Sequence, residues 1–172
     1  VATSDGGAIA VGLAGSNDGD VIGHHGGSDG WVVKVDAAGQ YQWQRTLGGS
    51  GMDDLSDVVS CPDGGYLVTG TTNSDDGDVS GGHGQEDMWL VKLDAAGDLL
   101  WQRTYGGTSV DKALAIAACS DGSFVIAGHT GSTDGDAVGN VYGGAYWVVK
   151  VDDVGDLIWQ HAYGGAGYDY GT

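Results

Sequence analysis

The sequence predicts an all-β protein made of three copies of one unit, each about 58 residues long. Three observations predict it. Two tryptophans recur at a spacing of 58 residues, and so does a pair of adjacent glycines. The positions are Trp31, Trp89 and Trp147, then Trp43, Trp101 and Trp159, and the glycine pairs at 48–49, 106–107 and 164–165. A fixed period of this size along a whole chain is the mark of a repeat architecture.

Each unit is expected to contribute four short strands. Apolar runs such as Ala8–Leu13 are separated by Asp- and Gly-rich turns, for example the hairpin at residues 36–39. No stretch has apolar residues at helical spacing, so no helix is predicted. Four strands in a unit of this length are typical of a β-propeller blade. Since closed propellers have about four to eight blades, three leave the ring open unless another copy or a longer chain completes it.

The repeat boundaries place residues 1–172 in one array. Repeat 1 covers about residues 1–52, repeat 2 about 53–110 and repeat 3 about 111–172, and the inner strand of the first repeat is incomplete. The runs Leu55–Val59 and Ala113–Ala118 have apolar or small residues on both faces. They are therefore expected to be inner strands covered on both faces. The second tryptophan of each unit is expected to pack between neighbouring units.

Composition limits the partners. Asp and Glu outnumber Lys and Arg by 24 to 6, giving a formal charge of −18. This excludes nucleic acid and anionic membrane surfaces, which require basic patches. There is no apolar run near 18 residues, so membrane insertion is not expected. Cys61 and Cys119 occupy the same repeat position, where a disulfide and two buried thiols both remain open.

The loop at residues 76–87 has the ligand order of a calcium-binding loop. Acids stand at its positions 1, 3 and 12, a hydroxyl at 5 and a glycine at 6, as in an EF-hand loop. In such loops alternate residues point oxygens at a cation that prefers six to eight of them. The predicted ligands are Asp76, Asp78, Ser80, the carbonyl of Gly82, and Asp87, with Glu86 as a substitute for the last.

The other two repeats keep part of this pattern. Repeat 1 supplies Asp18, Asp20 and Asp29, and repeat 3 supplies Asp134 and Asp136 but has Ala145 in place of the last acid. Calcium is therefore predicted as the bound ion. The alternative is that Asp-Gly-Asp is turn chemistry, with the Asp side chains accepting hydrogen bonds from nearby backbone.

The repeated hairpin resembles known propeller repeats. The segments LVKLDAAGDLLWQ, VVKVDAAGQYQWQ and VVKVDDVGDLIWQ look like the outer hairpin of quinoprotein-like propeller repeats. The whole unit, with DGGYLVTGTTNSDDGDVSG, more closely resembles the uncharacterised repeats of secreted bacterial β-propeller-type proteins. This resemblance covers all three units and implies a propeller-type fold and secretion or display at the cell surface. The acidic loops are similar in geometry to the calcium loops of integrin α-subunits.

Catalysis is not expected. The chain contains no G-x-S-x-G, H-E-x-x-H or phosphate-binding loop. The first hypothesis is an extracellular structural or adhesive module, stabilised by calcium, that associates with copies of itself or with further repeats of a longer chain. The alternative is a carbohydrate-binding propeller that holds glycans with loop Asp and His residues and with Tyr142 or Tyr168. A quinoprotein-like dehydrogenase fragment is the lesser alternative.

Overall fold

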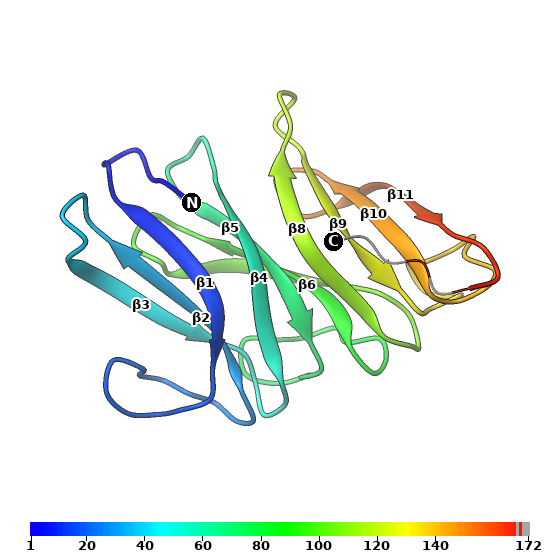
Figure 1. The fold of residues 1–172 in the computed structure, drawn as a ribbon, viewed down its shortest axis with the longest axis horizontal. Helices are drawn as coiled ribbons and strands as arrows, with labels where there is room; N and C mark the ends of the chain where they lie inside the picture. Colours follow the sequence, from blue (N-terminus) through cyan, green and yellow to red (C-terminus); the bar gives the residue numbers. More distant parts are fainter. Residues whose placement is uncertain (168, 170–172) are drawn as a thin grey trace.

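Three antiparallel sheets stand side by side in the computed structural model, which describes residues 1–167 and 169 (Figure 1). Every regular element within those residues is a strand, as the sequence predicts. Sheet 1 contains β1 (Ala8–Ala14), β2 (Asp29–Val35) and β3 (Tyr41–Leu47). Sheet 2 contains β4 (Asp53–Ser60), β5 (Tyr66–Thr72), β6 (Asp87–Leu93) and β7 (Leu99–Tyr105). Sheet 3 contains β8 (Asp111–Ala118), β9 (Phe124–Thr130), β10 (Ala145–Val151) and β11 (Leu157–Tyr163).

Within each sheet the strands follow one another in chain order, each paired with the next. Among the described residues sheet 1 has three strands, without a counterpart of β4 and β8. The three sheets form an open array and not a closed ring (Figure 1). Strand β1 is consequently an edge strand in sheet 1.

Two hydrophobic clusters hold the sheets together. One lies between sheets 1 and 2, the other between sheets 2 and 3. Strand β6 contributes to both, since Trp89 and Val91 belong to the first cluster and Met88 and Leu90 to the second. All seven residues of β6 are buried for this reason. Each fully buried large side chain contributes about 1.5–3 kcal/mol relative to an exposed one, so sheet 2 anchors the array.

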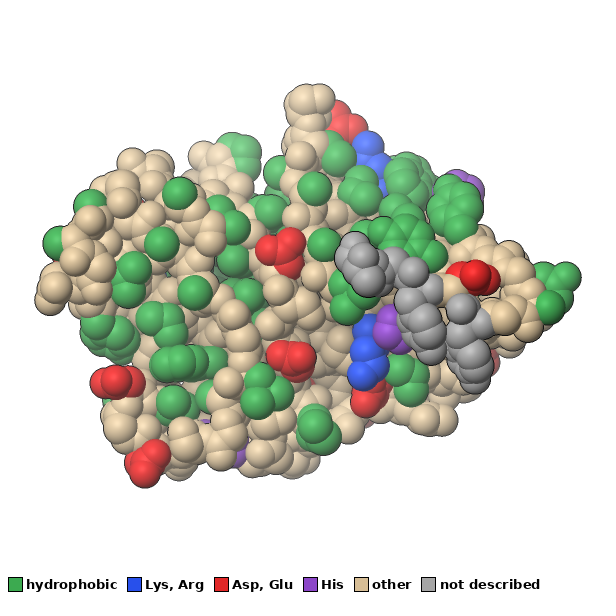
Figure 2. Space-filling model, in the orientation of Figure 1, with side chains coloured by type: hydrophobic (Ala, Val, Ile, Leu, Met, Phe, Trp, Pro, Cys, Tyr) green, Lys and Arg blue, Asp and Glu red, His purple; other side chains and the backbone are tan. Residues whose placement is uncertain are grey.

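The prediction that the inner strands are covered on both faces is wrong for β8, and in β4 only part of each face is buried. In β4 and β8 buried positions alternate with exposed ones, and Leu114 is among the exposed hydrophobic residues. Among the described residues β8 has a neighbouring sheet on one face, whereas β4 packs between β1 of sheet 1 and β8 of sheet 3. Figure 2 shows the side of the molecule on which β1, β4 and β8 lie in Figure 1. Hydrophobic side chains are spread over this side among a few charged ones.

Repeated polar bonds fix the strands in each sheet. The indole N–H of the first tryptophan in each repeat donates to a glutamine 13 residues later, on the next strand, at 2.8, 3.0 and 2.9 Å. The pairs are Trp31–Gln44, Trp89–Gln102 and Trp147–Gln160. The two cysteines are free thiols, Cys61 buried and Cys119 half-buried. Burial raises the pKa of the Cys61 thiol.

Candidate functional site: the junctions between sheets

The Gly-Gly segments after β3 and β7 each bind the Asp-Gly-Asp turn of the next sheet. We call residues 48–50 and 106–108 connectors, and residues 76–78 and 134–136 D-G-D turns. At the first junction Ser50 N–H donates to Asp76 Oδ1 at 2.7 Å, across 26 residues of sequence. Asp78 N–H donates to the carbonyl oxygen of Gly48 at 2.9 Å, and Gly48 N–H donates to Asp78 Oδ2 at 3.3 Å.

The second junction repeats these bonds. Thr108 N–H donates to Asp134 Oδ1 at 2.8 Å, and the Thr108 hydroxyl lies 3.0 Å from Asp134 Oδ2. Asp136 N–H donates to the carbonyl oxygen of Gly106 at 2.8 Å. The backbone donors hold the pKa of Asp76 and of Asp134 below the usual range. The first and third residues of each D-G-D turn thus fasten one sheet to the preceding one.

Glycine at the centre of the turn allows this close approach. Gly77 has φ +65°, and a Cβ built on it would lie 2.4 Å from the carbonyl oxygen of Gly48. Gly135 has φ +60°, and its Cβ would lie 2.2 Å from the carbonyl oxygen of Gly106. Both distances exclude a side chain at the centre of the turn. Glycine is therefore required there by the contact as well as by the positive φ.

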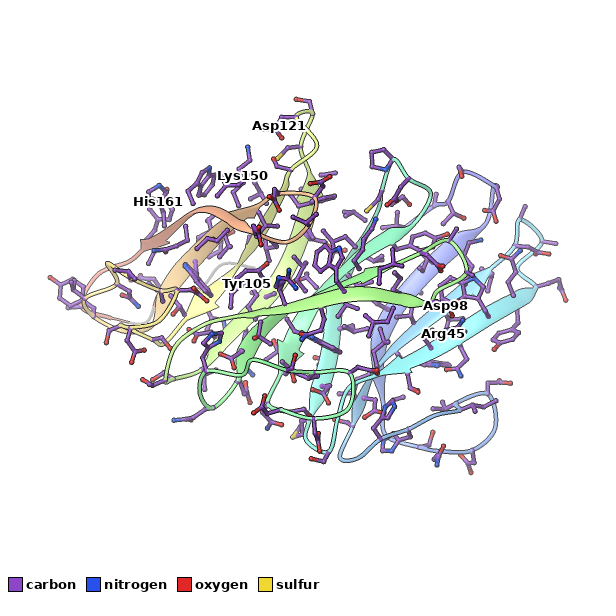
Figure 3. All side chains as sticks on the ribbon, turned by 180° about the vertical axis from the view of Figure 1, so that it is seen from behind. Arg45, Asp98, Tyr105, Asp121, Lys150 and His161 are labelled. Carbon is purple, nitrogen blue, oxygen red and sulfur yellow. The ribbon has the colours of Figure 1, made fainter. Side chains whose placement is uncertain are left out.

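A second contact joins the outer hairpins. A Cβ on Gly97, in the β6–β7 turn, would lie 2.8 Å from the Trp43 ring on β3. A Cβ on Gly155, in the β10–β11 turn, would lie 2.9 Å from the Trp101 ring on β7. Arg45 adds an ion pair to Asp98 at 2.7 Å, visible in Figure 3. The prediction that these tryptophans pack between units is confirmed for Trp43 and Trp101.

The predicted calcium ligands of repeat 2 face different partners. Asp76 and Asp78 face the connector of sheet 1, as described above. The Ser80 hydroxyl accepts a bond from Gln102 on β7 at 2.8 Å. The backbone of Gly82 lies beside Asp87, whose Oδ2 is 3.6 Å from a Cβ built on the glycine and accepts the His83 N–H at 2.8 Å. Of the five, Gly82 and Asp87 line one small cavity.

The predicted ligands of repeats 1 and 3 divide in the same way. Asp134 and Asp136 bind the second connector. Asp29 is buried at the start of β2 and accepts bonds from the His25 N–H at 2.6 Å and its ring at 3.0 Å. Asp18 and Asp20 lie on the exposed turn of sheet 1. No group of three His, Cys, Asp or Glu side chains that could hold a metal was found among the described residues.

A small cavity of about 290 Å³ lies beside the repeat 2 loop. Asp75, Gly82 and Asp87 line it, together with Asn73, Ser74, His83 and Gly84. Asp75 was not among the predicted ligands, although it directly precedes the D-G-D turn in the sequence. Its Oδ1 accepts bonds from the N–H groups of Gly81 and Gly82 at 3.2 and 3.4 Å. A Cβ built on Gly82 would lie 3.6 Å from Asp87 Oδ2 and 3.9 Å from Asp75 Oδ1, so both carboxylates lie beside this glycine.

Buried carboxylates begin the strands at each junction. Asp53 accepts bonds from Gly49 N–H and the Ser74 hydroxyl, each at 2.8 Å, and from the Thr72 hydroxyl. Asp111 repeats this set with Gly107, Ser132 and Thr130. The sequence patterns did not identify either residue as part of a site, although Asp53 and Asp111 stand one repeat, or 58 residues, apart.

Asp87, like its counterpart Asp29, differs from these two acids because one of its buried oxygens has no hydrogen-bond partner. Its Oδ1 has no hydrogen-bond partner and lies 3.7 Å from the nearest ring nitrogen of His83. Burial raises the pKa of Asp87, and the nearby charge of Asp111 acts in the same direction. A Cβ built on Gly106 would touch both carboxylates, at 2.3 and 2.7 Å. Two buried acids therefore lie close together at the second junction.

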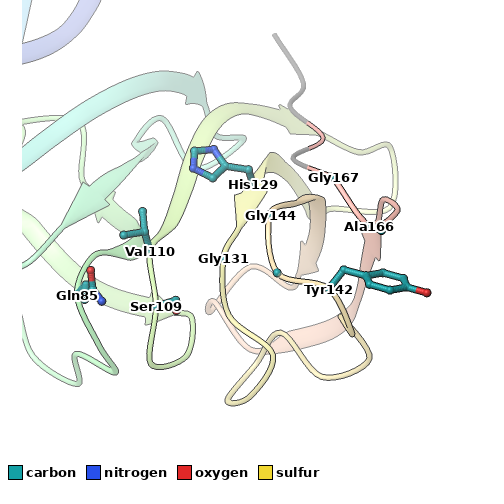
Figure 4. Close-up of a pocket in the computed structure, with 10 residues that line it drawn as sticks. Gln85, Ser109, Val110, His129, Gly131, Tyr142, Gly144, Ala166 and Gly167 are labelled. Carbon is teal, nitrogen blue, oxygen red and sulfur yellow. The ribbon is translucent and has the colours of Figure 1, made fainter.

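A groove of about 660 Å³ opens beside sheet 3 (Figure 4). Its lining includes His129 at the end of β9, Ser109 and Val110 before β8, and Tyr142 in the β9–β10 loop. Gly143 and Gly144 stand here at the positions where repeat 2 has Gln85 and Glu86. The loss of two side chains explains why the groove occurs at this repeat. Tyr168, the other tyrosine predicted to hold glycans, lies outside the described residues.

Comparison with known proteins identifies no family. The sequence matches no known family and no curated protein. Among solved structures, the chain is similar to a protein of unknown function from Bacteroides caccae, with 12% identity over 79% of this chain and 77% of that one, and a TM-score of 0.25. No helix in residues 1–167 and 169 has the length and hydropathy of a membrane span.

Proposed function

We propose that the protein is a non-enzymatic structural or adhesive module, secreted or displayed at the cell surface, that associates with copies of itself. In this proposal the three sheets are blades of an open β-propeller, and calcium stabilises the loops between them. A longer chain could supply the same contacts through further repeats.

One observation carries the proposal. The residue that ends the last strand of each sheet is covered by a neighbouring sheet in sheets 1 and 2 but is exposed in sheet 3. The last residue of each outer strand is Leu47, Tyr105 or Tyr163. Leu47 is 3% exposed and Tyr105 is 5% exposed, because the next sheet covers each of them. Tyr163 is 57% exposed, and Trp159 on the same strand is exposed as well. Exposed aromatic side chains at the end of an array favour association.

The calcium part of the proposal rests on the oxygens around the small cavity of sheet 2. Asp75 and Asp87 contribute carboxylates, which are the ligand type that a hard cation prefers. A chain of net charge −18 would also gain stability from a bound divalent cation, which lowers the repulsion between its acids.

The test is the native mass of the particle, measured by sedimentation velocity over a range of protein concentrations. The measurement is made with millimolar calcium and with a chelator. We expect assemblies larger than one chain, and a lower melting temperature in the chelator. A protein that stays a monomer at every concentration, with the same melting temperature in both buffers, would contradict the proposal.

The groove beside sheet 3 favours carbohydrate binding as a second candidate function. Tyr142 offers an exposed ring on which a sugar could stack, and His129, Ser109 and Gln85 bring polar groups. A glycan array tests this with Tyr142→Ala and with Tyr41→Ala, an exposed tyrosine on β3, as the matched control. Binding of one sugar class that is lost only in Tyr142→Ala supports it, whereas no reproducible binding removes it.

A further inference from the structure

The two ends of the array carry the two halves of a junction that occurs twice inside the chain. Sheet 3 ends in the third Gly-Gly segment, residues 164–166, which has the sequence position of a connector. Sheet 1 carries the third D-G-D turn, residues 18–20. In the described chain neither is in contact with its counterpart, so each half can be compared with two occupied examples.

The connector half is formed but open. Gly165 N–H donates to Asp169 Oδ2 at 2.7 Å, as Gly49 donates to Asp53 and Gly107 to Asp111 at 2.8 Å. A Cβ on Gly49 or Gly107 would lie 2.3 Å from the first Asp of the next D-G-D turn. For a Cβ on Gly165, the nearest atom among the described residues is Asp169 Oδ2, at 4.0 Å. The third connector has the local structure of the others without their neighbour.

The receiving half is open at three positions on sheet 1. Gly19, at the centre of the third D-G-D turn, has φ +64° like Gly77, yet nothing lies within 4 Å of its Cβ. Gly39, the counterpart of Gly97 and Gly155, has φ +75° and is equally free. The Asp18 carboxylate accepts no hydrogen bond among the described residues, whereas the carboxylates of Asp76 and Asp134 each accept one from the backbone of a connector.

We propose that a second copy of this chain docks head to tail, with sheet 3 of one copy against sheet 1 of the next. Residues 164–166 then bind the turn at 18–20, and Trp159 packs on Gly39. This inference rests on the proposed self-association and names its interface. The Tyr163 hydroxyl reaches the carbonyl oxygen of Gly39, as the Tyr105 hydroxyl reaches that of Gly155.

The residues that meet at the open ends differ from those of the first junction in a matched way. At the first junction Arg45 binds Asp98 at 2.7 Å and the carbonyl oxygen of Ala96 at 3.1 Å. The counterpart of the arginine on β11 is His161, and the counterpart of Asp98 on sheet 1 is Gln40. The two replacements match each other. In the head-to-tail contact position 40 would lie opposite His161, so a carboxylate there would have no arginine to bind. Figure 3 shows His161 on β11, at the outer end of sheet 3.

The contact is heterologous, since its two surfaces differ. A heterologous contact adds copies in one direction and gives a ring or an open filament. A symmetric contact between two sheet 3 surfaces would place Trp159 against Trp159 and leave the turn at 18–20 unused. The two arrangements predict different behaviour of variants that block one end.

The experiment uses one variant for each end. Trp159→Ser with Tyr163→Ser blocks sheet 3. Gly39→Asn blocks sheet 1, because asparagine tolerates positive φ and its side chain would occupy the space that the Trp159 ring needs. The matched controls are Ile158→Ser and Gly64→Asn. Ile158 is 52% exposed, and its counterpart Leu100 remains 56% exposed beside a neighbouring sheet. Gly64 has φ +86° and open space around its Cβ, although sheet 2 has a neighbour on each side.

Sedimentation velocity is measured for each protein and for an equal mixture of the two end variants. We expect the controls to associate like the parent protein, and each end variant alone to raise the dissociation constant about tenfold or more. The mixture should form a dimer and stop there, because one open end of each kind remains. Asp18→Ala, on the exposed turn, serves as a second sheet 1 variant if Gly39→Asn lowers the melting temperature of the monomer.

The outcomes separate the two proposals. A parent protein that never associates refutes the self-association itself. An associating parent with a mixture that stays monomeric, or with a Gly39→Asn variant that associates as strongly as the parent, refutes only the head-to-tail interface. The second of these results would indicate a symmetric contact between sheet 3 surfaces.

Discussion

The hydroxyl of Tyr105 donates a hydrogen bond to the carbonyl oxygen of Gly155, joining the end of sheet 2 to the outer turn of sheet 3. Burial raises the pKa of this phenol well above its usual range. Figure 3 places Tyr105 where sheets 2 and 3 meet. The bond ties the packing of the outer strands to the backbone of the next hairpin.

Tyr105→Phe is expected to destabilise the chain by about 1 kcal/mol, because the Gly155 carbonyl loses its donor in a buried setting. Tyr163→Phe is the control, since the exposed phenol at this position has no neighbouring sheet in the same chain. Urea unfolding at a concentration where the protein is monomeric measures both. Equal stability of Tyr105→Phe and the parent would show that the bond contributes nothing.

Gly97→Ala is expected to be more destabilising than Gly39→Ala. The two glycines have φ +83° and +75°, so both alanines carry similar backbone strain, about 1 kcal/mol. Only at Gly97 does the new methyl also meet the Trp43 ring, which adds about 1–3 kcal/mol of overpacking. Urea unfolding of the two variants measures the difference. A difference near zero would mean that the ring moves aside freely.

Much of the fold follows from the 58-residue period, and the calcium ligands show where pattern reasoning reaches its limit. The spacing of Trp31, Trp89 and Trp147 defines the three sheets. The Asp76–Asp78 turn satisfies a calcium-loop pattern and also binds a connector, since both require acids around a tight glycine turn. The hydrogen-bond partner of Asp76, Ser50, lies 26 residues away in the sequence. A 12-residue loop pattern does not extend that far.

The covering of strands could not be predicted from the strands alone. The apolar run in β8 looks buried on both faces, yet β6 is the strand with every residue buried. The difference depends on which strand of a sheet lies opposite its neighbours, and that is set by how the sheets stack. Composition records the total number of apolar residues but not this stacking.

Stability is expected to fall below about pH 4 through a repeated ion pair. Lysines on the middle strands bind aspartates of the inner hairpin turns, at 2.8, 2.7 and 2.8 Å. The pairs are Lys34–Asp5, Lys92–Asp63 and Lys150–Asp121. Hydrogen bonds from lysine hold the pKa of each carboxyl below its unfolded value. The stabilisation is therefore complete above the unfolded pKa and is lost as pH falls through the folded one.

Melting temperatures between pH 2.5 and 6 test this in Asp63→Asn. The variant should melt lower at pH 6 than the parent and lose less on acidification. Asp153→Asn, at an exposed acid without such a partner, should follow the parent throughout. Parallel curves for Asp63→Asn and the parent would contradict the role of the pair.

Asp87→Asn is expected to raise the melting temperature at pH 7 in the presence of a chelator. The carboxylate is buried, one of its oxygens has no hydrogen-bond partner, and Asp111 lies beside it. Because the folded pKa of Asp87 is raised, the parent loses stability as pH rises through it, and the asparagine variant does not. The gain should therefore shrink as pH is lowered towards 4. Asp54→Asn, at an exposed position on β4, is the control.

Calcium should reverse the order of the two proteins if Asp87 is a ligand. The parent would then gain melting temperature on addition of millimolar calcium, because the cation supplies the unpaired oxygen with a partner and offsets the repulsion from Asp111. Asp87→Asn would gain less, since an amide oxygen is a weaker ligand than a carboxylate. An equal calcium response in both proteins would place any bound ion elsewhere. A parent without any response would indicate that protonation of Asp87, favoured by its raised pKa, is what allows this acid pair to stay buried.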